Sequence, residues 1–329
     1  MAGPDLYAVY RAAVVTRAVD ERLWTLARQG RAGFVLTGRG HEIAQVVTAR
    51  AVTVGVDTAW LYYRDLGVAL TLGVSPYEVF LGALGRAADP HSGGRQLTAH
   101  FSDPALGIGS VSSEVGAHLV HAVGAAYAGM VKGTGEVAFC WFGDGAASEG
   151  GAHEAMNLAG VARLPVVFVC ENNGLAISVP ASQQSAGRIA DRAVGYGFEG
   201  ECADGTDAVA VHEVTTRAVD RARTGGGPSL LELTVPRIVP HSSQDDDAYR
   251  SDADREALRA SDPLIGLRAR CLDEGVLTAE ADAELLAQID AEVRDAAKRA
   301  IERAGPEPDR ARRWLLAGDP AHDREEDRG

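Results

Sequence analysis

The sequence predicts an α/β fold in which a parallel β-sheet is covered by helices on both faces. Three almost continuously apolar runs lead to that prediction, at residues 136–142, 165–170 and 230–235. Strands that are buried on both faces have this composition, because neither face of the sheet meets water. Residues 149–163, between the first two runs, have apolar positions at helical spacing. The resulting order of strand, helix and strand is typical of parallel sheets.

Helices are expected before and after this sheet. Residues 5–29 repeat apolar side chains at intervals of three and four, which predicts a helix at the N-terminus. Residues 115–131 predict a helix of small residues that allows close packing by another element. Residues 262–304 are also expected to be helical, with an apolar stripe that starts at Leu277 and with Thr278 as an N-cap.

No change of composition marks a linker between domains. We therefore expect residues 1–305 to form one domain with an N-terminal helical extension. Residues 306–329 are expected to be a short, charged tail that contains proline. Residues 30–110 are rich in glycine and in short polar motifs, which is typical of binding loops.

Composition excludes several classes of function. The chain has 329 residues, is 46% hydrophobic and carries a net charge of −14. That charge gives it no electrostatic attraction to nucleic acid or to an anionic membrane. No stretch reaches the roughly 18 apolar residues of a membrane span, and the N-terminus does not read as a signal peptide, so a cytoplasmic protein is expected. The cysteines form no Cys-x-x-Cys pair, and Cys140 and Cys170 are expected in the core.

Polar residues follow two of the predicted strands. Gly143-Asp144-Gly145 follows the first strand, and Asn172-Asn173 follows the second. Ligands of open parallel sheets bind beyond the carboxyl ends of the strands, and glycines there let backbone N–H groups approach an anion. An aspartate would repel a phosphate unless a cation lay between them. We therefore predict that Asp144 binds Mg²⁺ or Ca²⁺, which bridges to a diphosphate.

The segment after the second strand completes the predicted set of metal ligands. Asn173 offers an amide oxygen, and Leu175 offers a backbone carbonyl. Together with Asp144, two phosphate oxygens and a water, they would fill an octahedron. A single Gly-Asp-Gly is usually a turn and a single Asn-Asn-Gly is usually a loop. Their occurrence at the ends of two strands joined by a helix favours a shared site.

The same residues resemble the thiamine diphosphate motif of thiamine-dependent enzymes. GDGAASEG (143–150), ENNGLAIS (171–178) and RIVPHSSQDDDAYR (237–250) resemble the α subunit of heteromeric 2-oxo acid dehydrogenase E1 components, closest to the branched-chain type. The resemblance extends from about residue 5 to about residue 300. It implies the thiamine diphosphate-binding fold, of which this chain holds the diphosphate-binding half, with thiamine diphosphate and Mg²⁺ as cofactors.

The resemblance also implies further site residues. In such subunits a Tyr-Arg pair contacts the diphosphate, and a serine-rich turn holds the aminopyrimidine end. The 237–250 loop covers the mouth of the site, and its His241 is the candidate catalytic residue, while Arg237 and Arg250 are expected to fix the ends of the loop. The implied cofactor-binding residues are Tyr63, Arg64, Ser113, Val115, Gly143, Asp144, Gly145, Ala146, Asn173 and His241, and the implied metal ligands are Asp144, Asn173 and Leu175.

Other polar residues have weaker assignments. Ala117-His118 stand where the branched-chain type has a Thr-Gln pair beside a potassium site, so no potassium ion is predicted. His100 is a weaker candidate for the wall of the site, whereas His118, His121 and His153 are expected to pack between helices or lie on the surface. Glu149 is expected to be an acidic residue at a helix N-terminus, because the glutamate that activates the cofactor belongs to the β subunit in this family.

The resemblance implies a reaction and an assembly. The expected reaction is the oxidative decarboxylation of branched-chain 2-oxo acids, with acyl transfer to the lipoyl group of an E2 acyltransferase. The expected partners are a β subunit in an α₂β₂ heterotetramer, the lipoyl-bearing E2 and a small 2-oxo acid substrate, with no nucleic acid and no membrane. Two alternatives stay open: a pyruvate or acetoin dehydrogenase E1 α subunit, and a non-catalytic assembly subunit that retains the fold. The intact Asp144, Asn173 and Arg64 argue against the second.

Overall fold

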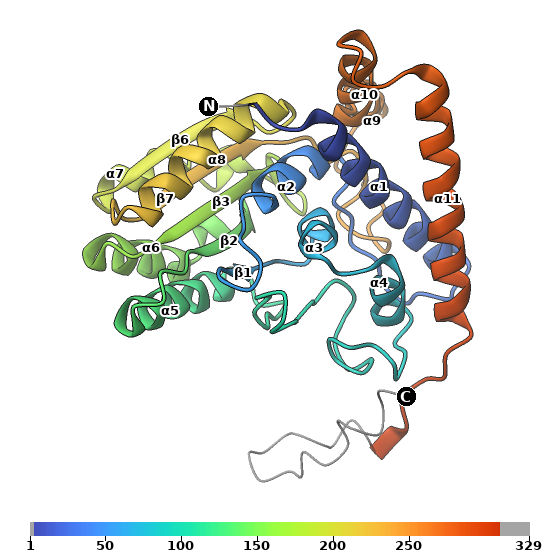
Figure 1. Ribbon diagram of the computed structural model, residues 1–329, viewed down its shortest axis with the longest axis horizontal. Coiled ribbons are helices and arrows are strands. Elements are labelled where there is room, and N and C mark those ends of the chain that lie inside the picture. Colours follow the sequence, from blue (N-terminus) through green and yellow to red (C-terminus); the bar gives the residue numbers. More distant parts are fainter. Residues whose placement is uncertain (1–2, 310–329) are drawn as a thin grey trace.

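The computed structural model describes residues 3–309, which fold around a five-stranded parallel sheet (Figure 1). The strand order is β1-β2-β3-β7-β6. The strands are β1 (Thr58–Trp60), β2 (Ala138–Gly143), β3 (Val166–Asn172), β6 (Glu199–Asp204) and β7 (Ser229–Thr234). The predicted α/β class is confirmed, and each of the three apolar runs forms a strand.

Side chains of the central strands alternate between two apolar clusters, one on each face of the sheet. Ala138 of β2 pairs with Val166 of β3. Trp141 belongs to the cluster on one face, and Phe168 belongs to the cluster on the other. Because both faces are buried, β2 and β3 are apolar at nearly every position, as the sequence predicted. Cys140 and Cys170 lie fully buried in this core, which confirms their assignment.

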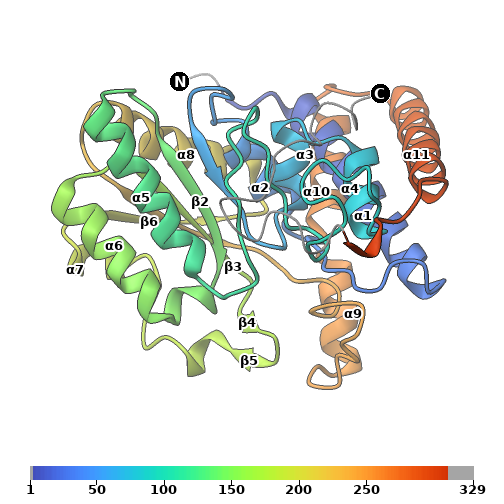
Figure 2. The ribbon, with the colours of Figure 1, turned by 90° about the horizontal axis from the view of Figure 1, so that it is seen from below.

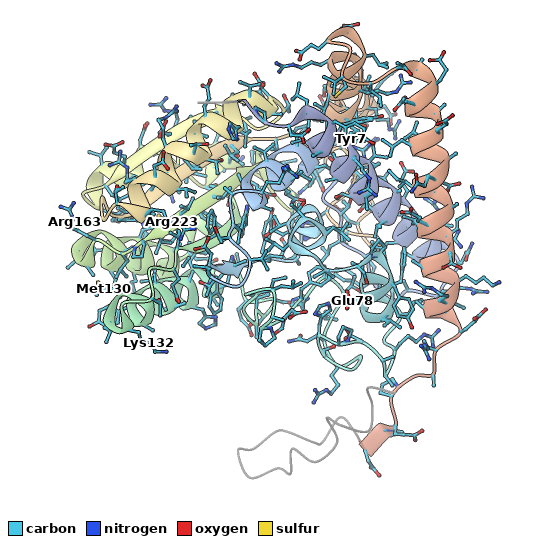
Figure 3. The ribbon with its side chains drawn as sticks, viewed as in Figure 1. Tyr7, Glu78, Met130, Lys132, Arg163 and Arg223 are labelled. Atoms are coloured by element: carbon cyan, nitrogen blue, oxygen red, sulfur yellow. The ribbon has the colours of Figure 1, made fainter. Side chains whose placement is uncertain are left out.

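Different helices cover the two faces (Figures 1 and 2). α5 (Ala117–Lys132) and α6 (Gly150–Ala162) pack on the face that contains Phe168. The opposite face is covered by α2 (Glu42–Ala49) and α8 (Ala208–Arg223). Met130 and Lys132 lie on the outer side of the molecule at the end of α5 (Figure 3).

Further helices extend the layer that contains α2. They are α1 (Leu6–Arg28), α3 (Leu66–Leu72), α4 (Pro76–Ala83), α9 (Asp252–Ala260), α10 (Pro263–Asp273) and α11 (Ala279–Ile301). Helix α11 packs on α1 and α4 and lies at the opposite side of the molecule from α6 (Figure 1). The short elements are η1 (Ala146–Ser148), β4 (Leu175–Ala176), β5 (Val179–Pro180), η2 (Ala181–Gln183) and α7 (Arg192–Gly195). The β4–β5 hairpin projects on the same side of the molecule as α9 (Figure 2).

The predicted helices at residues 5–29 and 115–131 are confirmed as α1 and α5. The helical region expected over 262–304 is confirmed as two helices, α10 and α11, and Thr278 is confirmed as an N-cap. They are separated because Gly275 adopts a φ of 68° after α10, and Thr278 then caps α11 by accepting the N–H of Ala281.

The glycine-rich segment 30–110 contains more helix than its composition predicted. It includes α2, α3 and α4, and α4 starts at a capping box formed by Ser75 and Glu78. These helices span only seven or eight residues each, so each offers about two turns in which apolar spacing can be recognised. Most of the tail expected from residue 306, namely 310–329, lies outside the described residues. None of the helices in the described part of the chain has the length and apolar character that crossing a membrane requires.

Candidate active site

A cavity of about 440 Å³ lies at the carboxyl ends of β2 and β3. Its wall comes from segments that are far apart in the chain: the turn after β1, the segment before α5, the two strand ends and the 237–250 loop. The predicted cofactor-binding residues and metal ligands all line this cavity: Tyr63, Arg64, Ser113, Val115, Gly143, Asp144, Gly145, Ala146, Asn173, Leu175 and His241.

A second and larger cavity, of about 730 Å³, lies between α1, α10 and α11. It is lined by residues of these helices and of the turn before α10, and it lies away from the strand ends. Ligands of parallel sheets bind at the carboxyl ends of the strands, where backbone groups and helix N-termini converge. We therefore take the smaller cavity as the candidate active site.

Asp144 lies directly after β2 at the base of the cavity. Its side chain is buried, and its Oδ2 atom has no hydrogen-bond partner among residues 3–309. Burial raises the pKa of the Asp144 carboxyl, while the backbone N–H groups of Asp144 and Asn173 oppose that rise. A buried carboxylate oxygen without a partner is unfavourable unless a cation neutralises it. Asp144 therefore has the chemistry of a ligand for a hard divalent cation.

The end of β3 and the start of the β4–β5 hairpin bring the other two predicted metal ligands, Asn173 and Leu175, to the same cavity. The Oδ1 atom of Asn173 accepts the N–H of Leu175 at 3.2 Å, which leaves one lone pair of the amide oxygen available. A Cβ atom on Gly145 would lie only 2.8 Å from the Cβ of Ala176, so this approach requires glycine. No set of three or more His, Cys, Asp or Glu side chains in residues 3–309 is placed to bind a metal. A cation here would depend on the carboxylate, amide and carbonyl oxygens.

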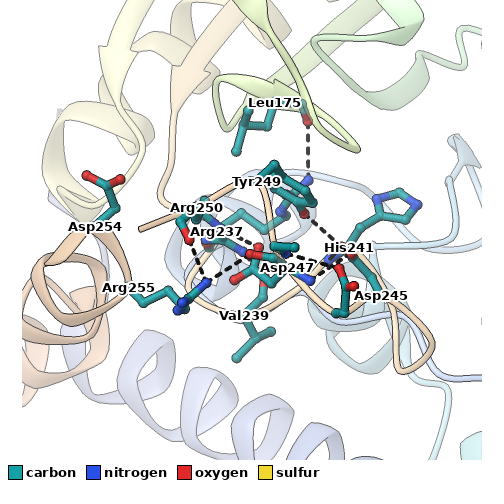
Figure 4. A network of polar contacts seen from close by, with 12 residues as sticks. Leu175, Arg237, Val239, His241, Asp245, Asp247, Tyr249, Arg250, Asp254 and Arg255 are labelled. Atoms are coloured by element: carbon teal, nitrogen blue, oxygen red, sulfur yellow. Dashed lines mark hydrogen bonds and ion pairs between the residues drawn. The ribbon is translucent and has the colours of Figure 1, made fainter. Parts of the chain in front are cut away.

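Arg237 binds the β4–β5 hairpin through backbone carbonyl groups. Its Nη2 donates to the carbonyl of Ile177 at 2.8 Å, and its Nη1 lies 3.4 Å from the carbonyl of Leu175 (Figure 4). Ile177 has a φ of 55°, a left-handed conformation that is unfavourable for a β-branched residue. Such strain persists only where the surroundings hold it, and it is concentrated at functional sites. The buried Arg237 guanidinium provides that restraint here.

Arg64 and His241 meet at the wall of the cavity. Arg64 is 3% exposed; its Nη1 donates to the carbonyl of Thr37 at 2.6 Å, and its Nη2 lies 3.2 Å from Nδ1 of His241. A guanidinium can only donate, so Nδ1 of His241 accepts and Nε2 carries the proton. Burial, followed by the charges of Arg64 and Arg237, lowers the pKa of His241 to about 4. His241 is therefore neutral near pH 7.

Tyr249 connects the 237–250 loop to Arg237. Its hydroxyl donates to Oδ2 of Asp245 at 2.7 Å and accepts from Nη2 of Arg237 at 2.6 Å (Figure 4). Asp245 Oδ2 also accepts the backbone N–H of His241 at 2.8 Å. The position of His241 is thus linked through two side chains to the arginine that holds the β4–β5 hairpin.

Arg250 closes the other end of the loop. It forms an ion pair with Asp247 at 2.6 Å and donates to the carbonyls of Arg237 and Val239 at 2.7 and 2.8 Å. The expectation that Arg237 and Arg250 fix the ends of this loop is confirmed. The sequence did not indicate the partners, because Arg237 reaches across to the β4–β5 hairpin.

At the other end of the cavity, Ser113 is held by His100. The Nδ1 of His100 lies 3.0 Å from the carbonyl of Thr98, and its Nε2 lies 2.7 Å from Oγ of Ser113. A carbonyl only accepts, so Nδ1 carries the proton and Nε2 accepts the hydroxyl proton of Ser113. His100, the weaker candidate for the wall, is buried and is not among the residues that line the cavity, but it contacts Ser113, which is.

Some residues of the wall had no signal in the sequence. His118 is buried as expected but also lines the cavity, and its Nε2 donates to the carbonyl of Trp141 at 2.7 Å. Glu149 lines the cavity at the N-cap position of α6, but its side chain accepts no capping hydrogen bond in the described part of the chain. Tyr62, Ser112, Glu114, Ile177 and Gln184 also line the cavity. Only proximity to a motif could have identified them.

Comparisons with known proteins place this site in a family context. Residues 10–309 match the family of dehydrogenase E1 components. The chain is 40% identical over 311 residues to the 2-oxoisovalerate dehydrogenase subunit alpha of Bacillus subtilis (strain 168), which covers 94% of each chain. It is 37% identical over 295 residues to the 3-methyl-2-oxobutanoate dehydrogenase subunit alpha of Mycobacterium tuberculosis, covering 88% of this chain and 77% of that one. It is 34% identical over 307 residues to the pyruvate dehydrogenase E1 component subunit alpha of B. subtilis, covering 92% and 79%.

Proposed function

The chain belongs to the dehydrogenase E1 component family, and we propose that it is the α subunit of a branched-chain 2-oxo acid dehydrogenase E1. Two relatives named for 2-oxoisovalerate or 3-methyl-2-oxobutanoate share 40% and 37% identity with it. The relative named for pyruvate shares 34%. The order of these identities supports branched-chain 2-oxo acids as the substrate class and keeps pyruvate as the second candidate.

One observation carries the assignment of the cofactor site: Oδ2 of the buried Asp144, which has no hydrogen-bond partner in the part of the chain that the structure describes, lies in a cavity that Arg64 also lines. The family depends on thiamine diphosphate. A cation beside Asp144 and an arginine nearby fit a diphosphate better than either residue does alone. We propose that Asp144, Asn173 and the carbonyl of Leu175 hold Mg²⁺.

The other predicted residues are proposed to contact different parts of the cofactor in the same cavity. We propose that Tyr63, Arg64 and His241 face the diphosphate and that Ser113 and Val115 hold the aminopyrimidine. The backbone of Gly143, Gly145 and Ala146 lines the approach to Asp144. When bound, thiamine diphosphate supplies the electron sink for decarboxylation, which protein side chains lack.

His241 contributes a neutral hydrogen-bond donor. Its Nδ1 is engaged by Arg64, so the proton on Nε2 is the one that it offers in the cavity. The lowered pKa keeps this imidazole neutral near pH 7 and makes it a weak base, while its Nε2–H can still donate to a substrate oxygen. The 237–250 loop would hold this donor in place and exclude water.

We further propose that the chain acts in an α₂β₂ assembly with an E1 β subunit and passes the acyl group to a lipoyl-bearing E2 acyltransferase. The relatives are named as α subunits, which supports the need for a partner. The carboxylate that activates the cofactor is assigned to the β subunit. Residues 1–305 are proposed to act as one unit in that assembly.

A substrate panel tests this function. The chain is co-expressed with a β subunit and supplied with thiamine diphosphate and Mg²⁺. Dye reduction is then followed with 3-methyl-2-oxobutanoate, 4-methyl-2-oxopentanoate, pyruvate and acetoin, and with Asp144→Ala as the inactive control. Preference for the two branched acids is expected, whereas preference for pyruvate or acetoin would reassign the substrate. An assembly that neither binds the cofactor nor turns over any substrate would favour a non-catalytic subunit.

A further inference from the structure

A fully buried carboxylate lies directly behind the candidate site. Glu171 is at the carboxyl end of β3, where it pairs in register with Gly143, the residue before Asp144. Its side chain is 0% exposed and does not line the cavity. Its Oε2 atom lies 2.6 Å from Nδ1 of His41 and 3.0 Å from Nε2 of Gln45. One oxygen of Glu171 therefore joins β3 to helix α2 and to the residue that precedes it.

The same oxygen holds the turn that contains Arg64. The hydroxyl of Tyr62 donates to Oε2 of Glu171 at 3.1 Å. Gln45 donates to the carbonyl of Arg64 at 3.0 Å and accepts the N–H of Gly67 at 3.0 Å. Within residues 62–67, Tyr62 thus contacts Glu171 directly, and Arg64 and Gly67 are connected to it through Gln45.

Burying the carboxyl groups of Glu171 and its neighbour Asp65 lowers the stability of the fold. Asp65, also fully buried, lies close enough to Glu171 that burial and the charge of Glu171 raise the pKa of the Asp65 carboxyl well above its usual range. Nε2 of His41 is buried and finds no hydrogen-bond partner within the described chain. Buried charged clusters contribute little net stability, because loss of hydration offsets their attraction. Stability alone therefore gives a poor account of this cluster.

We propose that Glu171 is a positioning residue, which fixes the Tyr62–Arg64 turn to the strand end that bears Asn173. Through this link, Arg64 from one segment and Asn173 from another would be held ready for a diphosphate and its cation. The inference rests on the proposed function, because it assumes that thiamine diphosphate with Mg²⁺ is the ligand. It assigns no contact with the cofactor to Glu171 itself.

Two small substitutions test the link. Glu171→Gln keeps the size of the side chain, and Tyr62→Phe removes only the hydroxyl group. Each variant is co-expressed with the β subunit, and thiamine diphosphate is titrated by calorimetry at a fixed concentration of Mg²⁺. Substitution of residues that orient metal ligands typically lowers affinity about 10- to 100-fold. The Kd of each variant for thiamine diphosphate is therefore expected to rise by roughly that factor. The double variant should bind thiamine diphosphate no more weakly than the weaker-binding single variant, because both substitutions act on the contact between Tyr62 and residue 171.

Asp282→Asn is the matched control. Asp282 is also a fully buried carboxylate, which accepts from Tyr10 at 2.7 Å and pairs with Arg268, far from the cavity. This variant is expected to lower the melting temperature and leave the Kd for thiamine diphosphate unchanged. The inference is overturned if Glu171→Gln and Tyr62→Phe behave in the same way as this control. A wild-type assembly that binds no thiamine diphosphate would overturn the proposed function itself.

Discussion

Nη2 of Arg64 lies 3.2 Å from Nδ1 of His241, although 177 positions separate the two residues in the chain. The contact joins the turn after β1 to the 237–250 loop. Because the guanidinium always donates, it fixes the tautomer of the histidine as well as its position. The conformation of the loop is therefore coupled to an arginine that lines the candidate cofactor cavity.

The first prediction concerns the order of this loop. Tyr249→Phe removes the hydroxyl that joins Arg237 to Asp245, so the 237–250 loop and the β4–β5 hairpin should both loosen. Hydrogen–deuterium exchange should rise in peptides that cover both segments, because their shared restraint is lost. Tyr77→Phe is the matched control, since its hydroxyl binds only Arg303 at the surface among the described residues. Unchanged exchange in the hairpin would contradict the proposed link.

The second prediction concerns the cation. Asp144→Ala should abolish Mg²⁺-dependent binding of thiamine diphosphate, because the carboxylate ligand is lost. The melting temperature of the protein without cofactor should change little. The substitution removes a buried carboxylate oxygen that has no partner among residues 3–309, and this offsets the loss of an acceptor for the backbone N–H groups of Asp144 and Asn173. Calorimetric titration and thermal melting measure the two effects separately. Retained cofactor affinity in this variant would refute the metal assignment.

The third prediction concerns acid stability. Burial lowers the pKa of His118 from 6.5 to about 4. Between these values the unfolded chain binds a proton that the folded chain does not, so stability is complete above pH 6.5 and declines as the pH falls towards 4. When the pH falls from about 7 to about 5, the free energy of unfolding should decrease by roughly 1–2 kcal/mol less in His118→Gln than in the unmodified protein. Urea unfolding of both proteins at the two pH values measures this difference, and equal losses would show that His118 does not contribute.

The fourth prediction concerns the packing of the N-terminal helix. Arg17 of α1 forms ion pairs with Glu42 at 2.7 Å and with Asp262 at 2.6 Å, and its side chain is 13% exposed. Arg17→Ala leaves both carboxylates without this partner and should lower the free energy of unfolding by about 3–5 kcal/mol. Arg294→Ala breaks an exposed pair with Asp290 in α11 and should cost no more than about 0.5 kcal/mol. Denaturant unfolding measures the free energy of unfolding of both variants. A similarly small decrease in the two would mean that the ion pairs of Arg17 contribute little to stability.

Sequence patterns predicted two kinds of element: strands that are buried on both faces and long helices that are buried along one side. The strands β2, β3 and β7 are buried on both faces, so their composition alone marks them. The long helices α1 and α11 have one buried side, and their spacing marks them equally well. Helices α2, α3 and α4 were missed, because each spans only seven or eight residues, which is too short for apolar spacing to distinguish a helix.

The sequence by itself determined the fold class, the Asp144 and Asn173 motifs and the resemblance to E1 α subunits. These depend on residues that are close together in the chain, where spacing and residue type carry the information. Only the tertiary structure revealed that Glu171 meets His41, Gln45 and Tyr62, or that His100 supports Ser113. Such contacts join segments that no local pattern relates. Their geometry is fixed by the strand order of the sheet and by the helices packed on it, because these decide which strand ends and turns share one edge.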